Sequence, residues 1–179
     1  MKKNSLPVRI YQMKLDWMIA YPVSGEILEK MQEAAERCLP IEGVSLPCYI
    51  TVRLCDDEEI RQINRKHRGL DRATDVLSFP SVHFPDGKTA GSCENLLRRE
   101  YDDEADAVFL GDIIISVPHL YAQAEEFGHS AEREASYLLV HGICHLMGYD
   151  HIKEEEKKRM RVMEELILNS VNMEEHHHD

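Results

Sequence analysis

Hydrophobic and polar residues repeat along the chain with two different periods. Side chains in residues 48–54 alternate between two faces, as in a half-buried strand. One face would carry Cys48, Ile50, Val52 and Leu54. Short apolar runs at 74–79, ended by Pro80, and at 109–116 predict two more strands. A first strand is expected at about residues 7–16.

Other segments repeat their apolar residues at helical spacing and begin or end with capping residues. Ser24, Asp56 and Ser130 are suitable N-caps, Pro118 suits a first helical turn, and Gly148 suits the left-handed position after a helix. The expected helices run from Ser24 to about Leu39, from Asp56 to about His67, from Pro118 to about Gly128, from Ser130 to about Gly148, and from about 153 to 171.

Strand and helix segments mix without regular alternation, which favours an α+β fold with a small mixed sheet covered by helices. The 179 residues, 43% of them apolar, predict one domain over 1–179. Residues 81–107 are polar, with no clean period, and are predicted to form a mobile surface insertion. Residues 172–179 are predicted to be a disordered tail, and their histidines are left out of site reasoning as a tag remnant or a natural tail.

Composition narrows the cellular setting. No apolar leader region and no run of 18 apolar residues occurs, so we expect a soluble, intracellular protein without membrane contact. The five cysteines are scattered and include no C-x-x-C pair, which argues against a disulfide framework and favours a reducing cytoplasm.

The formal net charge of −12 disfavours non-specific binding of nucleic acid along the surface, so any RNA contact must be local. One segment, RQINRKHRGLDR at 61–72, concentrates basic residues against a single acid, Asp71. Taken alone, this segment is equally compatible with a solvated helix face and with a surface that contacts phosphates.

The stretch HGICHLMGYDH at 141–151 contains three histidines. His141 and His145 lie one turn apart on the same side of a helix, and Gly148 allows the chain to reverse so that His151 returns to them. Three imidazoles around Zn²⁺ leave a fourth position open for water, which is typical of a catalytic site. The alternative is that these are separate core or surface histidines, and the glycine at the reversal makes the metal site the better interpretation.

Cys144 lies between two of these histidines, but a fourth protein ligand would close the coordination sphere, so a buried thiol is expected there. The histidine and glycine spacings match the metzincin peptidase motif H-E-x-x-H-x-x-G-x-x-H. That motif carries a glutamate as general base after its first histidine, where this chain has Gly142. The pattern therefore predicts a zinc site that acts on another class of substrate.

HGICHLMGYDH, together with HRGLDRATDVLSFP at 67–80 and LGDIIIS at 110–116, closely resembles the YbeY family of bacterial rRNA maturation factors, over about residues 50–167. The resemblance implies a zincin-like fold with the metal site on a helix and the turn after it. It also implies a metal-dependent, single-strand-specific endoribonuclease that acts in 3′-end maturation of 16S rRNA and in ribosome quality control in the bacterial cytoplasm. Implied partners are single-stranded rRNA, the small ribosomal subunit and ribosomal proteins or assembly factors.

The resemblance assigns one Zn²⁺ per chain to His141, His145 and His151, and the functionally important arginine of the family to Arg68. Arg68 has the chemistry to stabilise charge that develops on phosphate oxygens. Further contacts to the RNA backbone are predicted for Arg61, Arg65, Lys66 and Arg72. Because of their helical spacing, only some of these residues can face one cleft.

The sequence does not identify a general base. Asp150 is expected to orient an imidazole or to satisfy the turn, and Asp75 and Asp112 are either cleft residues or structural carboxylates. Direct hydrolysis and attack by the ribose 2′-hydroxyl stay equally open. Two other functions also stay open: a non-catalytic, zinc-stabilised ribosome-assembly factor, and a zincin-like hydrolase of peptides or small molecules, against which Gly142 argues.

Overall fold

The computed structural model describes residues 13–171 of the chain. Strand β1 covers Met13–Ile19, so the first strand extends three residues beyond the end predicted for it, and the predicted part at 7–12 lies outside the described residues. Met13 and Leu15 alternate inward, and Trp17 packs against the same core. The end of the strand differs from the prediction because β1 continues with Met18 and Ile19, which pair with β2 although their side chains are exposed.

The strands form one mixed sheet in the order β1-β2-β5-β3, with β4 also paired to β5. Strands β1, β2 and β5 are parallel, whereas β3 and β4 run antiparallel to β5. Their bounds are β2 Cys48–Cys55, β3 Val76–Pro80, β4 Tyr101–Asp102 and β5 Ala107–Ser116. The predicted small mixed sheet is therefore confirmed, and Pro80 ends an edge strand, where the missing N–H is tolerated.

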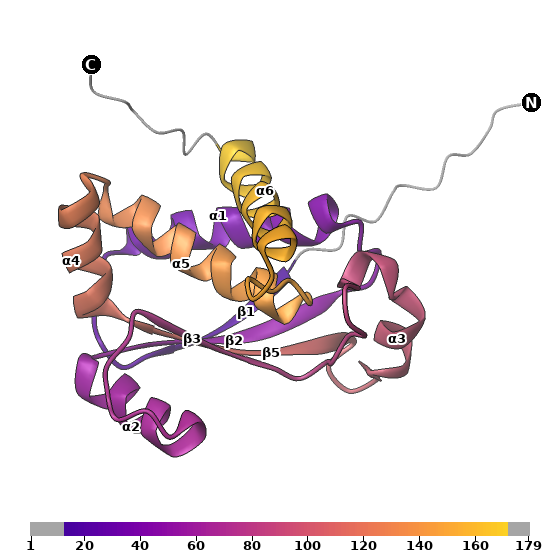
Figure 1. The fold of residues 1–179 in the computed structure, drawn as a ribbon, viewed down its shortest axis with the longest axis horizontal. Helices are drawn as coiled ribbons and strands as arrows, with labels where there is room; N and C mark the ends of the chain where they lie inside the picture. The colour runs from indigo at the N-terminus through magenta and orange to yellow at the C-terminus, as the bar shows by residue number, and fades with distance from the viewer. Residues whose placement is uncertain (1–12, 172–179) are drawn as a thin grey trace, which may run out of the picture.

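Helices lie on both sides of the sheet (Figure 1). On one side are α1 Gly25–Glu42, α4 Val117–Phe127, α5 Ala131–Leu146 and α6 Glu154–Ser170, of which α6 packs on α1 and α5. Helix α2, Asp57–Arg68, lies against the opposite face over a small cluster around Ile60 and Leu77. The main core lies between α5, α1 and the sheet, and among residues 13–171 no helix combines the length and apolar character that crossing a membrane requires.

Helix α1 continues past the predicted end near Leu39. Pro40 lies inside its last turn, where only one backbone hydrogen bond is lost, and the helix ends at Gly43, which has a φ of 83° and donates to the carbonyls of Leu39 and Pro40. The side chain of Glu42 is thereby placed at the end of α1. The predicted N-caps are confirmed, since the side chains of Ser24, Asp56 and Ser130 each accept a backbone N–H.

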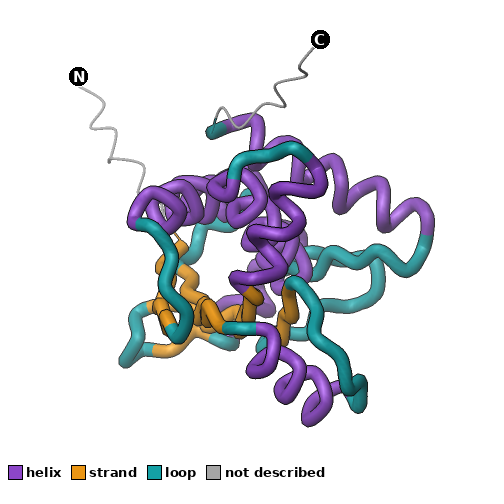
Figure 2. Tube along the Cα trace, turned by 90° about the vertical axis from the view of Figure 1, so that its left-hand side faces the viewer, coloured by secondary structure: helices purple, strands orange, loops and turns teal. Residues whose placement is uncertain are grey.

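The segment 81–107, predicted to be a mobile surface insertion, contains regular structure that its polar composition does not indicate. It contains a 3₁₀ turn, Ala90–Ser92, a short helix α3, Glu94–Arg99, and β4. Val82, Ala90 and Leu97 are buried in the main core. These elements are too short to show a period, so the tertiary contacts that order them are not visible in the sequence. Figure 2 shows helices, strands and loops along the trace of the chain. The mobility of segment 81–107 stays a prediction.

Candidate metal centre and its cleft

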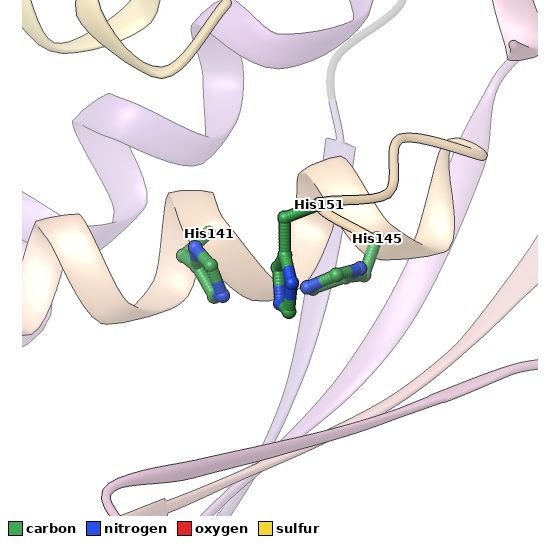
Figure 3. Close-up of side chains that lie close together, drawn as sticks. All are labelled: His141, His145 and His151. Carbon is green, nitrogen blue, oxygen red and sulfur yellow. The ribbon is translucent and has the colours of Figure 1, made fainter. Parts of the chain in front are cut away.

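The three histidines lie together beneath the end of α5 (Figure 3). His141 and His145 project from successive turns of the helix, and His151 returns from the segment after it. One ligand atom of each imidazole lies within 4.8 Å of the others. His145 meets the other two rings nearly edge-on, with centroids 4.8 and 4.9 Å away. The spacing argument is thus confirmed as a juxtaposition in space.

Two of the imidazoles are held through their Nδ1 atoms. His141 Nδ1 lies 3.2 Å from Oε1 of the buried Glu164 on α6, and His145 Nδ1 lies 3.0 Å from the carbonyl oxygen of Tyr149. Both partners accept a hydrogen bond, so each imidazole carries its proton on Nδ1 and leaves the Nε2 lone pair available to a metal. Such partners fix both the tautomer and the ring orientation of a ligand histidine.

The chain reverses between the second and third histidines at Gly148, whose φ is 97°. The Tyr149 N–H donates back to the carbonyl of Cys144, which closes the end of α5. A Cβ at Gly148 would lie 2.8 Å from the Lys88 carbonyl oxygen and 2.9 Å from the Phe84 ring. Glycine is therefore required twice, for the left-handed conformation and for the close approach of 81–107.

Glu42, at the end of α1, joins this reversal to the rest of the molecule. Its Oε2 accepts a 2.6 Å hydrogen bond from the Tyr149 hydroxyl, and its Oε1 accepts a 2.8 Å bond from the Gly91 N–H. The same Tyr149 whose carbonyl holds His145 is therefore anchored to two distant parts of the chain. Sequence reasoning missed Glu42, which lies beyond the helix end predicted near Leu39.

The donors suit a transition metal ion that prefers nitrogen ligands. Burial and the neighbouring His141 and His151 lower the pKa of His145 to about 4, so this imidazole is neutral and able to coordinate near pH 7. Three imidazole nitrogens on one concave surface match the composition of a three-histidine site. His151 is the most exposed of the three, which leaves its side of the centre open to solvent.

The histidines line a cleft of about 690 Å³ that also contains Arg68. Arg68 is the last residue of α2, and its Nη2 donates to the Ser78 carbonyl at 3.2 Å while its guanidinium lies over the Phe79 ring. The facing wall includes His83 and Phe84 from segment 81–107. The structure thus brings together the predicted metal ligands and the predicted catalytic arginine from opposite faces of the sheet edge.

The other predicted RNA contacts do not line this cleft. Arg61 is held by Asp71 through two hydrogen bonds, of 2.9 and 3.2 Å, and it pairs with Glu58 as well. Arg65, Lys66 and Arg72 are exposed beside α2 but are absent from the cleft wall. Along α2, residue 66 points away from residue 68, whereas Arg61 shares the side of Arg68 but lies two turns earlier in the helix, where it is paired with Asp71 and Glu58.

The candidate carboxylates divide into cleft residues and a distant one. Asp150 borders the cleft, and its Oδ1 accepts a 2.7 Å hydrogen bond from the His151 N–H, so it stabilises the turn. The imidazoles themselves are held by Glu164 and by the Tyr149 carbonyl. Asp75 also borders the cleft and accepts from Gln123 and from the Val76 N–H. Asp112 is hydrogen bonded by Thr51 and does not line the cleft.

Gly142 occupies the close contact between α5 and β5. A Cβ at this position would lie 2.9 Å from Cδ1 of Ile113 and 3.1 Å from its Cγ2, so residue 142 faces the sheet. The residue that replaces the peptidase glutamate thus has a packing role. Cys144 is fully buried in the main core, which confirms the expected thiol, and burial raises its pKa well above the usual range.

Comparison with known proteins defines the family. Residues 20–172 match the sequence model of the family described as endoribonuclease YbeY. The endoribonuclease YbeY of Clostridium perfringens is 43% identical over 156 residues, which cover 86% of this chain and 92% of that protein. The endoribonuclease YbeY of Acetivibrio thermocellus is 42% identical over 152 residues, covering 85% and 91%. The chain belongs to the endoribonuclease YbeY family.

The fold has a solved counterpart. The solution structure of TM1509 from Thermotoga maritima is similar to this chain with a TM-score of 0.53. The two share 22% identity, and the match covers 93% of this chain and 99% of the other. The likeness supports the mixed fold of a five-stranded sheet with covering helices.

Proposed function

We propose that this chain is a zinc-dependent, single-strand-specific endoribonuclease with a zincin-like arrangement of its metal site. The observation that carries the proposal is the shared cleft: three imidazoles that fit a metal and one guanidinium line the same cavity of about 690 Å³. Family membership supplies the substrate class, since the relatives are named endoribonucleases.

His141, His145 and His151 would hold the ion, which supplies Lewis acidity toward a phosphate oxygen. Arg68 contributes a cation that needs no proton transfer and can donate two parallel hydrogen bonds to non-bridging oxygens. Its contacts to Ser78 and Phe79 hold it at the cleft wall before substrate arrives. Placing fixed positive charge where phosphate charge increases is the main requirement of phosphodiester cleavage.

The depth of the site supports a preference for single strands. The His141 side chain is only 23% exposed, so a phosphate must enter between the cleft walls to reach the imidazoles. A duplex presents its phosphates on a broad convex surface, whereas an unpaired strand can bend into a cleft. The net charge of −12 further restricts the RNA to places where cations are concentrated.

The biological role we propose is 3′-end maturation of 16S rRNA and ribosome quality control in the bacterial cytoplasm, with the small subunit and its proteins or assembly factors as partners. The bacterial relatives named endoribonuclease YbeY support this assignment. The exposed Arg65, Lys66 and Arg72, which lie outside the cleft, are the residues we assign to contacts with the RNA backbone beyond the cleaved bond.

The decisive experiment compares cleavage of a labelled single-stranded RNA by wild-type, His145→Ala and Arg68→Ala proteins, with zinc measured in each. We expect one zinc per chain and cleavage in the wild type, loss of both in His145→Ala, and retained zinc without cleavage in Arg68→Ala. Equal residual cleavage in all three would show a contaminating nuclease and would favour the non-catalytic assembly factor.

Analysis of the cleaved ends separates the two chemical routes. A 5′-phosphate with a 3′-hydroxyl indicates direct hydrolysis, whereas a cyclic phosphate indicates attack by the ribose 2′-hydroxyl. Asp75 and Asp150 are the cleft carboxylates available to assist a proton transfer, and both already accept hydrogen bonds from the protein.

A further inference from the structure

A second cavity, of about 480 Å³, adjoins the metal cleft along α5. The two cavities share Asp75 and Tyr137 in their walls, so they lie next to each other. The wall of the second cavity also includes Phe127, Glu134 and Glu164. Tyr137 and Phe127 are 38% and 59% exposed, so their rings can be reached from solvent.

Glu134 is the feature of this cavity that nothing in the fold explains. The residue is only 3% exposed, yet within residues 13–171 its carboxylate takes part in no hydrogen bond or ion pair. Burial and the nearby carboxylate of Asp75 raise its pKa. Within residues 13–171, Asn64 Oδ1 is the one fully buried side-chain atom without a hydrogen-bond partner, so the carboxylate oxygens of Glu134 reach the cavity and can accept a hydrogen bond from an external donor.

The position of Glu134 relates it directly to the metal centre. Glu134, Leu138, His141 and His145 are spaced at intervals of four, three and four residues, which places them along one side of α5. Seven residues of helix separate Glu134 from His141, a distance of about 10 Å. A strand whose phosphate lies at the imidazoles therefore brings the base of a flanking nucleotide within reach of Glu134.

The chemistry of the second cavity selects a base over a phosphate. The carboxylates of Asp75, Glu134, Glu164 and Glu165 outnumber the guanidinium groups of Arg133 and Arg161 in its wall, so the excess of negative charge disfavours a phosphate group. The face of an exposed aromatic ring offers a stacking surface for a nucleobase. A buried carboxylate accepts hydrogen bonds from an exocyclic amino group, such as N4 of cytosine, and is mismatched to the O4 acceptor of uracil.

We propose that this second cavity is a base-selective subsite, in which Glu134 accepts a hydrogen bond from the exocyclic amino group of a nucleotide that flanks the cleaved phosphate and Tyr137 stacks on its base. This inference rests on the proposed function as an RNA-cleaving enzyme. It adds a preference for amino-bearing bases over uracil at one position of the substrate.

The test compares binding of two short single-stranded RNAs, oligo(C) and oligo(U), which have equal charge and differ at the pyrimidine edge. Binding is measured by fluorescence anisotropy. All 2′-hydroxyls of the probes are methylated, and each probe is checked for cleavage after the measurement. We expect wild-type protein to bind oligo(C) about fivefold or more tightly than oligo(U). In Glu134→Gln the preference should fall to about twofold or less, because an amide can pair with either edge.

Glu132→Gln is the matched control, since it removes the same charge from the same helix at a residue outside the cavity wall. Glu134→Asp retains the negative charge, but its shorter side chain places the carboxylate farther from the base, so the preference for oligo(C) should be intermediate. It also serves as a second test if Glu134→Gln does not fold. Equal binding of both probes by wild type, or an undiminished preference in Glu134→Gln, overturns the subsite. Cleavage of an unmodified RNA by the same wild-type preparation reports separately on the proposed function.

Discussion

The two ends of the cleft are built in different ways. At the metal end, two of the three imidazoles have a dedicated partner, and Tyr149 is anchored in turn by Glu42. At the other end, Arg68 is the last residue of α2 and is held by one carbonyl and one aromatic face. A metal site requires several ligands at fixed positions at the same time, whereas the arginine requires only one guanidinium held at the cleft wall. The contrast predicts different sensitivities to substitution.

The largest effect is expected at Arg68. Arg68→Lys keeps the positive charge but loses the planar, two-pronged donor, so we expect cleavage to fall by about 100-fold with zinc content unchanged. Single-turnover cleavage rates and metal analysis check this, with Arg65→Lys as the control on the same helix. A lysine variant within about threefold of wild type would mean that only the charge of Arg68 matters.

Next in size is Glu164, which fixes His141 from α6. Glu164→Gln retains an acceptor but removes the negative charge, and we expect zinc to bind about tenfold more weakly. Competition with a chromophoric chelator measures the affinity, and the exposed neighbour Glu165→Gln is the matched control. Unchanged affinity in Glu164→Gln would show that the imidazole is oriented by packing alone.

Tyr149→Phe tests whether the anchoring by Glu42 contributes to the metal end. The substitution removes the 2.6 Å hydrogen bond but leaves the backbone carbonyl that holds His145. We expect a loss of about 1 kcal/mol in the free energy of unfolding, with a drop in zinc affinity of only a few fold. Urea unfolding of the zinc-free protein gives the first quantity. A large loss of zinc with no loss of stability would contradict this order of effects.

The smallest effect is expected at Gly142. Alanine there gains about 1 kcal/mol of helix propensity, but its Cβ must displace Ile113, and overpacking costs about 1–3 kcal/mol. We expect a net destabilisation of about 1 kcal/mol without a change in zinc binding. In the background of Ile113→Val, which removes the atom nearest the new Cβ, Gly142→Ala should become neutral or stabilising. Thermal unfolding of the wild type, the two single variants and the double variant measures these changes in a double-mutant cycle.

How well the site can be predicted depends on how far apart in the sequence its interacting residues lie. The helix period and one glycine were sufficient to place His141, His145 and His151 together, because all three lie within eleven residues. Glu164 and Glu42 act across 23 and 107 residues of sequence, and no local period reports such contacts. A signal for Glu164 did exist, since an acid on the apolar stripe of α6 between Met160 and Ile167 is unusual.

The same rule applies to the fold. Strands β2 and β5 and the five long helices were found from their periods and caps. The 3₁₀ turn, α3 and β4 were not, because short elements without a period are held by contacts such as the buried side chain of Leu97. Likewise, the positions of Arg61 and Arg65 away from the cleft follow from the packing of α2 on the sheet, which composition does not encode.

The bond between Glu42 and Tyr149 also has a consequence for synthesis of the protein. Glu42 leaves the ribosome early, whereas Tyr149 and His151 are among the last parts of the folded region to emerge. The loop that presents His151 is therefore fastened to a helix made more than a hundred residues before it. Zinc bound by all three histidines would then require that the segment from Glu42 to His151 has been made and has folded together.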